Sequence, residues 1–516
     1  MKFKNLITTT VLFLLVPFIL NAQEEKVNLD VVYKIKKEGK SNSEIEELSF
    51  WMTDFVGPRL TASQAKLSAN EWVKNKMIEF GLENVVIDEV RDFDRGAWDN
   101  KRTYVAMTSP YYANFSAVPK AWTGSTNGEI KGEAVLIDIK KEEDFEKYQG
   151  KLQGKIVVLP STATYEVDFE PLATRYTEDD LLRIQEESTS SRRRRGNFDY
   201  SAYLKMRKLR QKISELLKEE GASVILNGSG QFNVPRANGA RYKSGEPEPI
   251  SEVNLPVEAH GRIMRLLKHN VVVELEVDVK NEFTKSPQVT NVMGEIKGVD
   301  PELKGEVVLI GGHLDSWHGG TGAADNASGC IVMMEAMRIL KALDVKPRRA
   351  IRIALWGGEE QGLHGSRGYV EKYIRNPKNY KLKQGFENFT AYFNMDNGTG
   401  KFRGIYLQEN EMVRPIFEAW MKPFNSMGMK TIAIRNTGGT DHQAFDPLGL
   451  PAFQFIQDDI EYGRGYHTNM DTYERLIMDD LKHNAIVIAA FVYHAAMRDE
   501  QLPRKPYIAP APKENE

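Results

Sequence analysis

The chain has 516 residues, more than one compact hydrophobic core usually organises, so we expect two domains. Apolar residues make up 41% of the sequence and charged residues 27%, which is typical of a globular protein and excludes a membrane-embedded or disordered chain. The formal net charge of -3 provides no attraction for nucleic acid, and we predict no nucleic-acid partner.

The first residues have the layout of a secretory signal peptide. Lys2 and Lys4 precede an apolar run, Val11 to Leu20, and the small residue Ala22 comes before polar residues. The run is too short to span a bilayer, and no other segment reaches the roughly 18 apolar residues of a membrane helix. We predict a signal peptide at residues 1–22, no stable membrane span, and export to the periplasm or the medium. A buried N-terminal strand or helix is the alternative.

Cys330 is the only cysteine, so an exported chain would have no intramolecular disulfide. It precedes an apolar helical stretch at 331–334. This setting favours a buried structural thiol over a nucleophile.

The middle of the chain has its own alternation of strands and helices. Strand patterns occur at 155–159, 223–226 and 273–280, and helical patterns at 203–220 and 257–269. Segment 273–280 alternates strictly between apolar and charged residues, which indicates a half-buried strand, and we expect it near a sheet edge.

We interpret residues 115–285 as an inserted smaller α/β domain that divides the main domain. The main domain then consists of 23–114 and 286–501, and the proline-rich residues 502–516 form a loose tail. Within the insert, residues 186–196 contain a run of four arginines in a Ser/Thr-rich setting. We expect a solvated loop there, with a role as a lid or anion contact as the alternative.

From Asn291 onward, buried strands alternate with helices. Short apolar strands are predicted at 307–310, 351–355 and 391–393, with a helix over 327–343 between the first two. This order predicts an α/β fold with a mixed, mostly parallel sheet sandwiched by helices.

Carboxylates and imidazoles follow each of these strands. In an open α/β sheet, ligands bind beyond the carboxyl ends of the strands. The residues in question are His313, Asp315, Asp325, Glu359, Glu360, Asp396 and, in a glycine-rich loop late in the chain, His467. The alternative is that each is an ordinary charged residue in a solvated loop. That alternative explains any one of these residues, but not all of them together.

A mixed imidazole and carboxylate set without thiolate suits Zn²⁺ in a catalytic site, with Mn²⁺ and Co²⁺ as weaker candidates. One tetrahedral zinc with an open position has too few places for all the candidate ligands, whereas two ions that share a carboxylate accommodate them. We therefore predict two zinc ions per chain, held by His313, Asp325, Glu360, Asp396 and His467.

Five motifs occur in an order that resembles the co-catalytic zinc peptidases, a family that includes bacterial leucyl aminopeptidases and carboxypeptidase Q (plasma glutamate carboxypeptidase). They are HLDS, ADNASG, WGGEEQGLHGS, NMDNG and YHTNMDT. The resemblance covers most of the mature chain and is densest between His313 and Asp396. It implies a zinc exopeptidase fold whose catalytic domain is interrupted by a protease-associated domain.

The resemblance also implies a role for each ligand. Asp325 resembles the carboxylate that bridges two zinc ions. His313 and Asp396 match the other ligands of one ion, and Glu360 and His467 match those of the second.

Two further acids match the catalytic residues of the family. Glu359 matches the general base, and adjacent side chains in an extended segment point to opposite sides, so Glu359 and Glu360 can take different roles. Asp315 resembles the acid that orients the ligand imidazole, and we expect it to fix the tautomer of His313.

Other polar residues are weaker candidates. A loop with Gly439, Thr440, Asp441 and His442 resembles a family loop that contacts substrate, with a plain glycine-rich turn as the alternative. We expect His364 to be structural or exposed, whereas the sequence leaves open whether His318 lines the pocket. Arg435 and Arg464 are candidate cations for a substrate carboxylate, with ordinary surface arginine as the alternative.

The sequence thus predicts a zinc-dependent exopeptidase that hydrolyses terminal bonds of short peptides through a metal-activated water. The sequence leaves open whether the enzyme acts at the amino or the carboxyl end of a peptide. It also leaves open whether the protein forms a homodimer. A one-zinc acyltransferase resembling glutaminyl cyclases and a non-catalytic binding relative are the alternatives.

Overall fold

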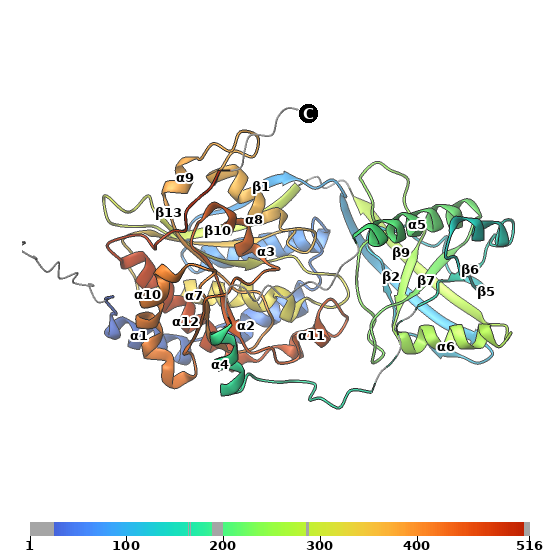
Figure 1. Ribbon diagram of the computed structural model, residues 1–516, viewed down its shortest axis with the longest axis horizontal. Helices are drawn as coiled ribbons and strands as arrows, with labels where there is room; N and C mark the ends of the chain where they lie inside the picture. The colour runs from blue at the N-terminus through green and yellow to red at the C-terminus, as the bar shows by residue number, and fades with distance from the viewer. Residues whose placement is uncertain are drawn as a thin grey trace, which may run out of the picture.

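The computed structural model describes residues 25–161, 163, 165, 167–187, 200–284 and 288–509. The predicted signal peptide and nearly all of the arginine-rich segment lie outside this range, so those interpretations stay predictions. Two units, each built on one sheet, lie along the long axis of the molecule (Figure 1). No helix in the described part of the chain is long and apolar enough to cross a membrane.

The first unit contains the first sheet, which has eight strands among the described residues. In sheet order these are β1 (Glu83–Asp92), β10 (Gln288–Ile296), β12 (Ala350–Trp356), β11 (Val307–His313), β13 (Phe389–Asn394), β16 (Ala452–Gln457), β14 (Phe402–Tyr406) and β15 (Thr431–Ala433). The central strands β12, β11, β13 and β16 run parallel, and antiparallel pairs flank them. The predicted mixed, mostly parallel sheet is confirmed.

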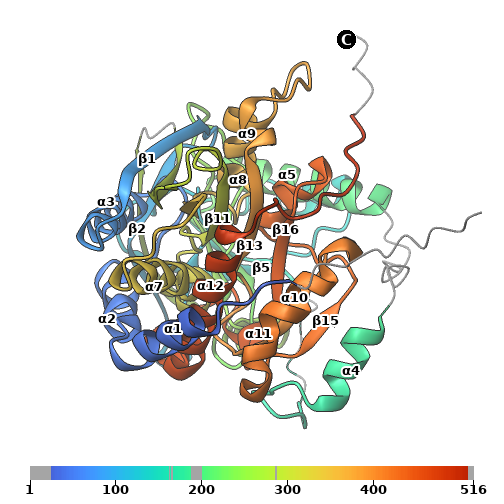
Figure 2. The same cartoon turned by 90° about the vertical axis from the view of Figure 1, so that its left-hand side faces the viewer.

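Helices cover both faces of this sheet because alternate residues of the buried strands point to opposite sides (Figure 2). On one face, Val308, Ile310 and Phe393 belong to the main core. The helices of that core are α1 (Leu29–Ser41), α2 (Ile45–Phe50), α3 (Gln64–Glu79), α7 (Ser328–Ala342), α10 (Arg414–Met421) and α12 (Met478–Met497). On the other face, Leu309 and Tyr392 pack with α8 (His364–Tyr369) and Phe445.

The second unit contains the second sheet, again with eight strands among the described residues. In sheet order these are β3 (Ala113–Asn114), β2 (Ala97–Ser109), β9 (Glu274–Thr284), β5 (Ile130–Leu136), β6 (Ile156–Val158), β7 (Val224–Gly228), β8 (Glu252–Leu255) and β4 (Val118–Pro119). Two helices flank the sheet, α5 (Tyr200–Glu219) and α6 (Val257–Lys268). Strands β2 and β3 come from residues that the sequence assigned to the main domain.

The alternating segment 273–280 forms most of β9, but β9 pairs with β2 and β5 on its two sides. It is therefore not an edge strand, although it is the third strand from one edge of the sheet. An alternating sequence indicates that one face of a strand is buried and the other faces solvent. An interior strand has the same alternation as an edge strand when only one face of its sheet is covered. Val277 and Val279, for example, are buried while Lys280 is exposed.

One segment from the predicted insert returns to the first unit. Helix α4 (Glu178–Glu186) lies beneath the larger unit in Figure 1 and packs against β15. Arg175 forms ion pairs with Asp458 at 3.0 Å and Asp480 at 2.7 Å, and Asp458 is almost fully buried. Residues 174–187 thus fasten the second unit to the first, and the residue ranges of the two domains stay a proposal.

An aromatic cluster in the main core predicts a large cost for one substitution. The ring of Phe491 is fully buried and lies 5.6 to 5.9 Å from the rings of Phe393, Trp420 and Phe455. We expect Phe491→Ala to destabilise the first unit by about 3–5 kcal/mol, because it leaves a cavity among rigid rings, and Phe491→Leu to cost less. Denaturant unfolding followed by tryptophan fluorescence measures both, and equal stabilities of the two variants would contradict the prediction.

Candidate active site

The parallel strands at the centre of the first sheet bring the predicted ligands to one edge. His313 is the last residue of β11, Glu359 and Glu360 follow β12, and Asp396 follows β13. These three strands are direct neighbours in register, so their carboxyl ends coincide. Asp325 lies in the helical turn Ala323–Ala327 that leads into α7.

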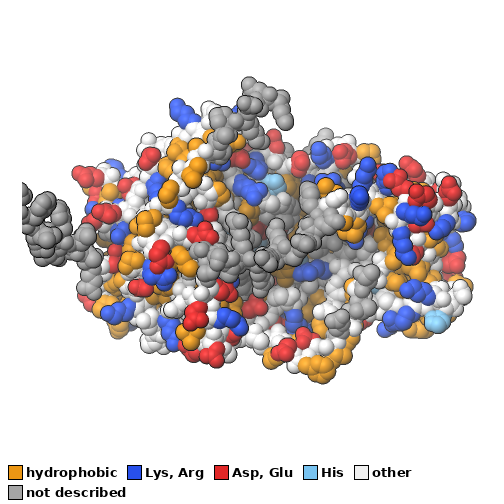
Figure 3. Space-filling model, viewed as in Figure 1, with side chains coloured by type: hydrophobic (Ala, Val, Ile, Leu, Met, Phe, Trp, Pro, Cys, Tyr) orange, Lys and Arg blue, Asp and Glu red, His pale blue; other side chains and the backbone are white. Residues whose placement is uncertain are grey.

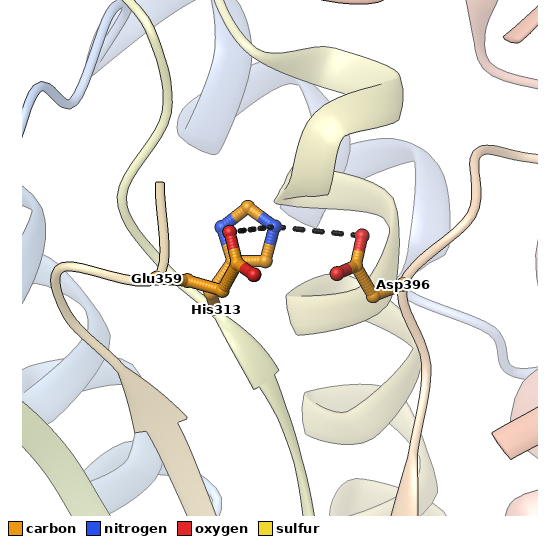
Figure 4. A group of neighbouring side chains, drawn as sticks. All are labelled: His313, Glu359 and Asp396. Carbon is orange, nitrogen blue, oxygen red and sulfur yellow. Dashed lines mark ion pairs between the residues drawn. The ribbon is translucent and has the colours of Figure 1, made fainter. Parts of the chain in front are cut away.

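The first group of side chains surrounds His313. Its Nε2 atom lies 3.2 Å from Asp325 Oδ1, 3.4 Å from Asp396 Oδ1 and 4.0 Å from Glu359 Oε2. Figure 4 shows the imidazole of His313 joined by dashed lines to the carboxylates of Glu359 and Asp396. Ligand atoms of His313, Glu359 and Asp396 lie within 4.8 Å of one another, which is close enough to surround one metal ion.

The second group surrounds His467. Its Nε2 atom lies 2.9 Å from Glu360 Oε2 and 3.3 Å from Asp325 Oδ2, and these three residues form a second possible ligand group. One oxygen of Asp325 therefore faces His313 and the other faces His467. The structure brings all five predicted ligands together, with Asp325 between the two groups.

The donor set fits divalent cations. Buried atoms Asp325 Oδ2, Glu360 Oε1 and His467 Nε2 have no hydrogen-bond partner in the protein. Burial raises the pKa of Glu359 and Glu360 well above the ordinary value, and neighbouring carboxylates, foremost Asp396 and Asp325 respectively, add to this effect. The cluster is thus short of positive charge, which two Zn²⁺ ions on imidazole and carboxylate ligands would supply.

His313 is oriented by a backbone group. Its Nδ1 lies 2.8 Å from the carbonyl oxygen of Asp315, whereas the carboxylate of Asp315 lies 3.8 Å from Nδ1. A proton on Nδ1 leaves Nε2 as the ligand atom. The hydrogen bond thus involves the backbone of Asp315, and the predicted role of its carboxylate in orienting His313 stays a prediction.

The carboxylate of Asp315 instead holds the loop after β12. It accepts hydrogen bonds from the backbone N–H groups of Glu359 at 3.1 Å and Glu360 at 3.3 Å, and from the Thr61 hydroxyl at 2.9 Å. Asp315 is fully buried. It therefore fixes the backbone from which the predicted base and one predicted ligand extend.

Sequence reasoning assigned no role to two residues that hold Asp325 and its loop. Asp471 accepts hydrogen bonds from the backbone of Ala324 at 2.6 Å and of Asp325 at 3.1 Å. Arg59 is fully buried and donates to the carbonyl oxygens of Leu314, Thr321 and Gly322, at 2.7, 2.6 and 2.8 Å. Asp471 lies in the motif YHTNMDT, and this motif was a signal that could have identified it. Arg59 lies more than 250 residues from these partners in the sequence.

The predicted substrate loop is mostly closed. Thr440, Asp441 and His442 are buried and Gly439 is exposed. The Thr440 hydroxyl accepts a hydrogen bond from Asn394 at 3.0 Å, and burial raises the pKa of Asp441 to about 7. Since the side chains pack beneath the loop, Gly439 is its solvent-facing part, and a role in substrate binding stays a prediction.

Three further residues have structural surroundings. Cys330 is buried as expected, with Sγ 3.0 Å from the His313 carbonyl oxygen. His318 is enclosed between the two units, with Nε2 2.7 Å from the Pro119 carbonyl oxygen, and burial lowers its pKa to about 4. His364 is partly buried beside Arg91.

Comparisons with known proteins agree with this geometry. Residues 291–492 match the model of Peptidase family M28. Carboxypeptidase Q from Mus musculus is 26% identical over 475 residues, which cover 90% of this chain and 88% of that protein. The comparisons thus confirm the predicted resemblance to this group of peptidases. The chain is a metallo-exopeptidase, and the predicted fold class and enzyme class are confirmed.

Other peptidases are similar over less sequence or at lower identity. Aminopeptidase YwaD from Bacillus subtilis is 29% identical over 203 residues, 38% of this chain and 42% of that protein. The solved structure of a Peptidase M28 precursor from Shewanella amazonensis has a TM-score of 0.64 at 23% identity and covers 92% of this chain and 98% of its own. BSAP, a zinc aminopeptidase from Bacillus subtilis, has a TM-score of 0.55 at 20% identity and covers 88% and 95%.

The contacts of Arg59 predict a loss of metal affinity on substitution. Arg59→Met removes donors that hold the loop between His313 and Asp325, so we expect zinc to bind about 10- to 100-fold more weakly. Zinc dissociation constants from competition with a chelator measure this change.

Arg349→Met is the matched control for overall destabilisation. Arg349 is equally buried but pairs with Glu306 at 2.6 Å, at the ends of β11 and β12 opposite to the ligand loops. We expect Arg349→Met to lower stability while zinc affinity stays near that of the wild type. Equal zinc affinities of the two variants would rule out a specific role of Arg59.

Proposed function

We propose that this metallo-exopeptidase is exported, binds two zinc ions per chain and removes terminal residues from short peptides. The observation that carries the proposal is the position of Asp325, whose two oxygens face His313 and His467. His313, Asp396 and Asp325 would hold one ion, and Glu360, His467 and Asp325 the other. The named relatives support exopeptidase chemistry, since they include a carboxypeptidase and an aminopeptidase.

When bound, zinc supplies Lewis acidity that polarises a scissile carbonyl and lowers the pKa of water. The chain's own contribution centres on Glu359, whose carboxylate faces the first ligand group. Glu359 accepts a proton from the attacking water and passes it to the leaving amine. Asp315 keeps that carboxylate in place through the backbone of Glu359.

The two alternatives have less support. A glutaminyl-cyclase-like acyltransferase would use one zinc, whereas the ligand atoms form two groups, and the two oxygens of Asp325 face the histidines of both. A non-catalytic relative would have no reason to keep both a complete ligand set and an acid in the position of Glu359. We also propose that the second unit is a protease-associated domain.

Substituting Glu359 and Glu360 one at a time distinguishes the proposed general base from the proposed metal ligand. We expect Glu359→Gln to lower kcat about 10²- to 10⁴-fold while about two zinc ions per chain remain, because a general base contributes this much and is no ligand. Glu360→Gln removes a ligand of one ion, so we expect about one zinc ion per chain.

Metal analysis by mass spectrometry and peptide hydrolysis assays measure both outcomes. Hydrolysis by the wild type that persists after thorough chelation would disprove the zinc mechanism. One zinc ion per wild-type chain at saturating metal would favour the acyltransferase instead.

Export predicts a defined mature N-terminus. If residues 1–22 are a signal peptide, the protein recovered from the periplasm or the medium begins at Gln23. Intact-mass spectrometry of the recovered protein measures this directly. An uncleaved chain that stays inside the producing cell would contradict the prediction.

A further inference from the structure

The two histidines of the candidate site are held in different ways. Nδ1 of His313 lies 2.8 Å from the Asp315 carbonyl oxygen, and this contact directs its Nε2 toward the other ligands. Nε2 of His467 lies 2.9 Å from Glu360 and 3.3 Å from Asp325, but its Nδ1 has no hydrogen-bond partner among the residues that the structure describes. The orientation of His467 therefore depends on contacts of another kind.

The backbone at His467 has an unfavourable conformation that contacts with the second unit enforce. Its φ of 59° lies in the left-handed region, which residues with a Cβ atom rarely adopt. Such a conformation persists only where the surrounding structure holds it. The carbonyl oxygen of His467 accepts a hydrogen bond from Ala237 N–H at 2.7 Å, and the next residue, Thr468, forms a β-bridge with Arg236. Ala237 and Arg236 belong to the second unit, so that unit fixes the backbone of a predicted ligand.

The imidazole of His467 is held by a ring stack. The ring of Tyr466 lies against it, with 3.6 Å between the ring centres and 25° between the ring planes. Adjacent side chains in an extended segment point to opposite sides, so this stack depends on the turn of the backbone at His467. The guanidinium of Arg236 lies over the Tyr466 ring, 5.1 Å from its centre. Since a cation is attracted to the face of an aromatic ring, Arg236 holds the ring that orients His467.

The loop that carries Arg236 and Ala237 is anchored within the second unit. The side-chain amide of Asn254, a buried residue of β8, donates to the Arg236 carbonyl oxygen at 2.8 Å and to Asn238 Oδ1 at 3.0 Å. Ala121 N–H donates to the Asn238 carbonyl oxygen at 2.9 Å. The loop therefore keeps its place relative to the second sheet, and a shift of that sheet against the first unit would move the groups that hold His467.

We propose that Tyr466 is a positioning residue for His467, and that docking of the second unit against residues 466–468 sets the affinity of the zinc ion that His467 holds. The proposal rests on the two-zinc site proposed above. With the units docked, the left-handed backbone and the ring stack keep His467 Nε2 facing the other ligands. Without these contacts the backbone relaxes and the imidazole turns away from the ion. His313 is oriented by Asp315 within the first unit, so the other ion is held whether or not the units are docked.

The dependence is reciprocal. If docking favours zinc binding at His467, zinc binding favours docking by the same factor, because both equilibria involve the docked state. Zinc thus stabilises the contact between the two units, although none of its predicted protein ligands belongs to the second unit. The two units therefore separate more often in the metal-free protein than in the zinc-loaded protein.

Two substitutions of Tyr466 test the ring stack. Tyr466→Leu removes the ring, so we expect one of the two zinc ions to bind about 10- to 100-fold more weakly, as for other residues that orient a metal-binding histidine. Tyr466→Phe keeps the ring and is expected to bind both ions nearly as the wild type does. Stepwise dissociation constants from competition with a chelator measure both variants. In the Glu360→Gln protein, which is expected to hold one ion, Tyr466→Leu should leave the affinity for that ion unchanged.

Substitution of Arg236 tests the contact from the second unit. Arg236→Met removes the cation over the Tyr466 ring, and we expect the same ion to bind about two- to fivefold more weakly, which is the effect of an exposed cation–π contact. Arg375→Met is the matched control. Its guanidinium lies 5.3 Å from the Tyr380 ring centre, in the segment before β13 and so at the opposite end of that strand from Asp396. We expect this control to leave both zinc affinities unchanged.

A pair of asparagines within the second unit separates docking from the stability of that unit. Asn254→Ala releases the loop from β8, and we expect the zinc ion at His467 to bind about 10-fold more weakly. Asn227→Ala is the matched control, because it removes a hydrogen bond to Glu252 at 2.6 Å in the neighbouring strand β7 and leaves the loop in place. We expect Asn227→Ala to leave both zinc affinities unchanged.

Hydrogen exchange tests the reciprocal effect in the unaltered protein. The Ala237 amide is bonded to the His467 carbonyl oxygen, so it exchanges when the two units separate locally. We expect zinc saturation to slow this exchange about 5- to 100-fold in the wild type, and to have little effect in the Glu360→Gln protein. Mass spectrometry of the peptide that contains Ala237 measures the exchange.

Three outcomes overturn the proposal and leave the proposed function intact. The first is unchanged zinc binding in either Tyr466→Leu or Asn254→Ala, and the second is equal weakening of both ions by Tyr466→Leu. The third is an exchange rate of the Ala237 amide that does not respond to zinc in a wild type that binds two ions. A wild type that binds only one zinc ion at saturation would instead contradict the proposed function.

Discussion

The carboxylate of Asp325 is the group on which the rest of the site depends, because its two oxygens face two different histidines. Placing a carboxylate among Glu359, Glu360 and Asp396 is costly unless cations compensate the charge. Its position is therefore enforced from outside the ligand set. Asp471 holds its backbone N–H group, and helix α7, buried over nearly its whole length, anchors the turn on which it lies.

The parallel centre of the first sheet explains why so few residues suffice to build this site. Neighbouring parallel strands end at the same edge, so His313, Glu360 and Asp396 are brought together by the hydrogen bonding of β11, β12 and β13. His467 joins them from a loop held by the second unit through Ala237. Away from this edge, Figure 3 shows acidic and basic side chains interspersed over the face in view, in keeping with the nearly balanced charge.

The sequence predicted those features of the fold and the site that a local pattern of residues determines. Apolar runs located the central strands, and the polar residues after them named the five candidate ligands. Asp315 was named as well, although spacing alone cannot tell whether its backbone carbonyl or its carboxylate is the nearer partner of His313. The contacts of Arg59 and the return of α4 to the first unit join distant segments, for which a single sequence has no signal.

Contacts between the two units reach the candidate site. The predicted metal ligands all belong to the first unit. Arg175 and Arg435 tie the connecting segment to the first unit, and Ala237 is bonded to the loop of His467. The first unit therefore contains every predicted metal ligand, and the second holds the loop of one of them in place, because the backbone of Ala237 is bonded to that of His467.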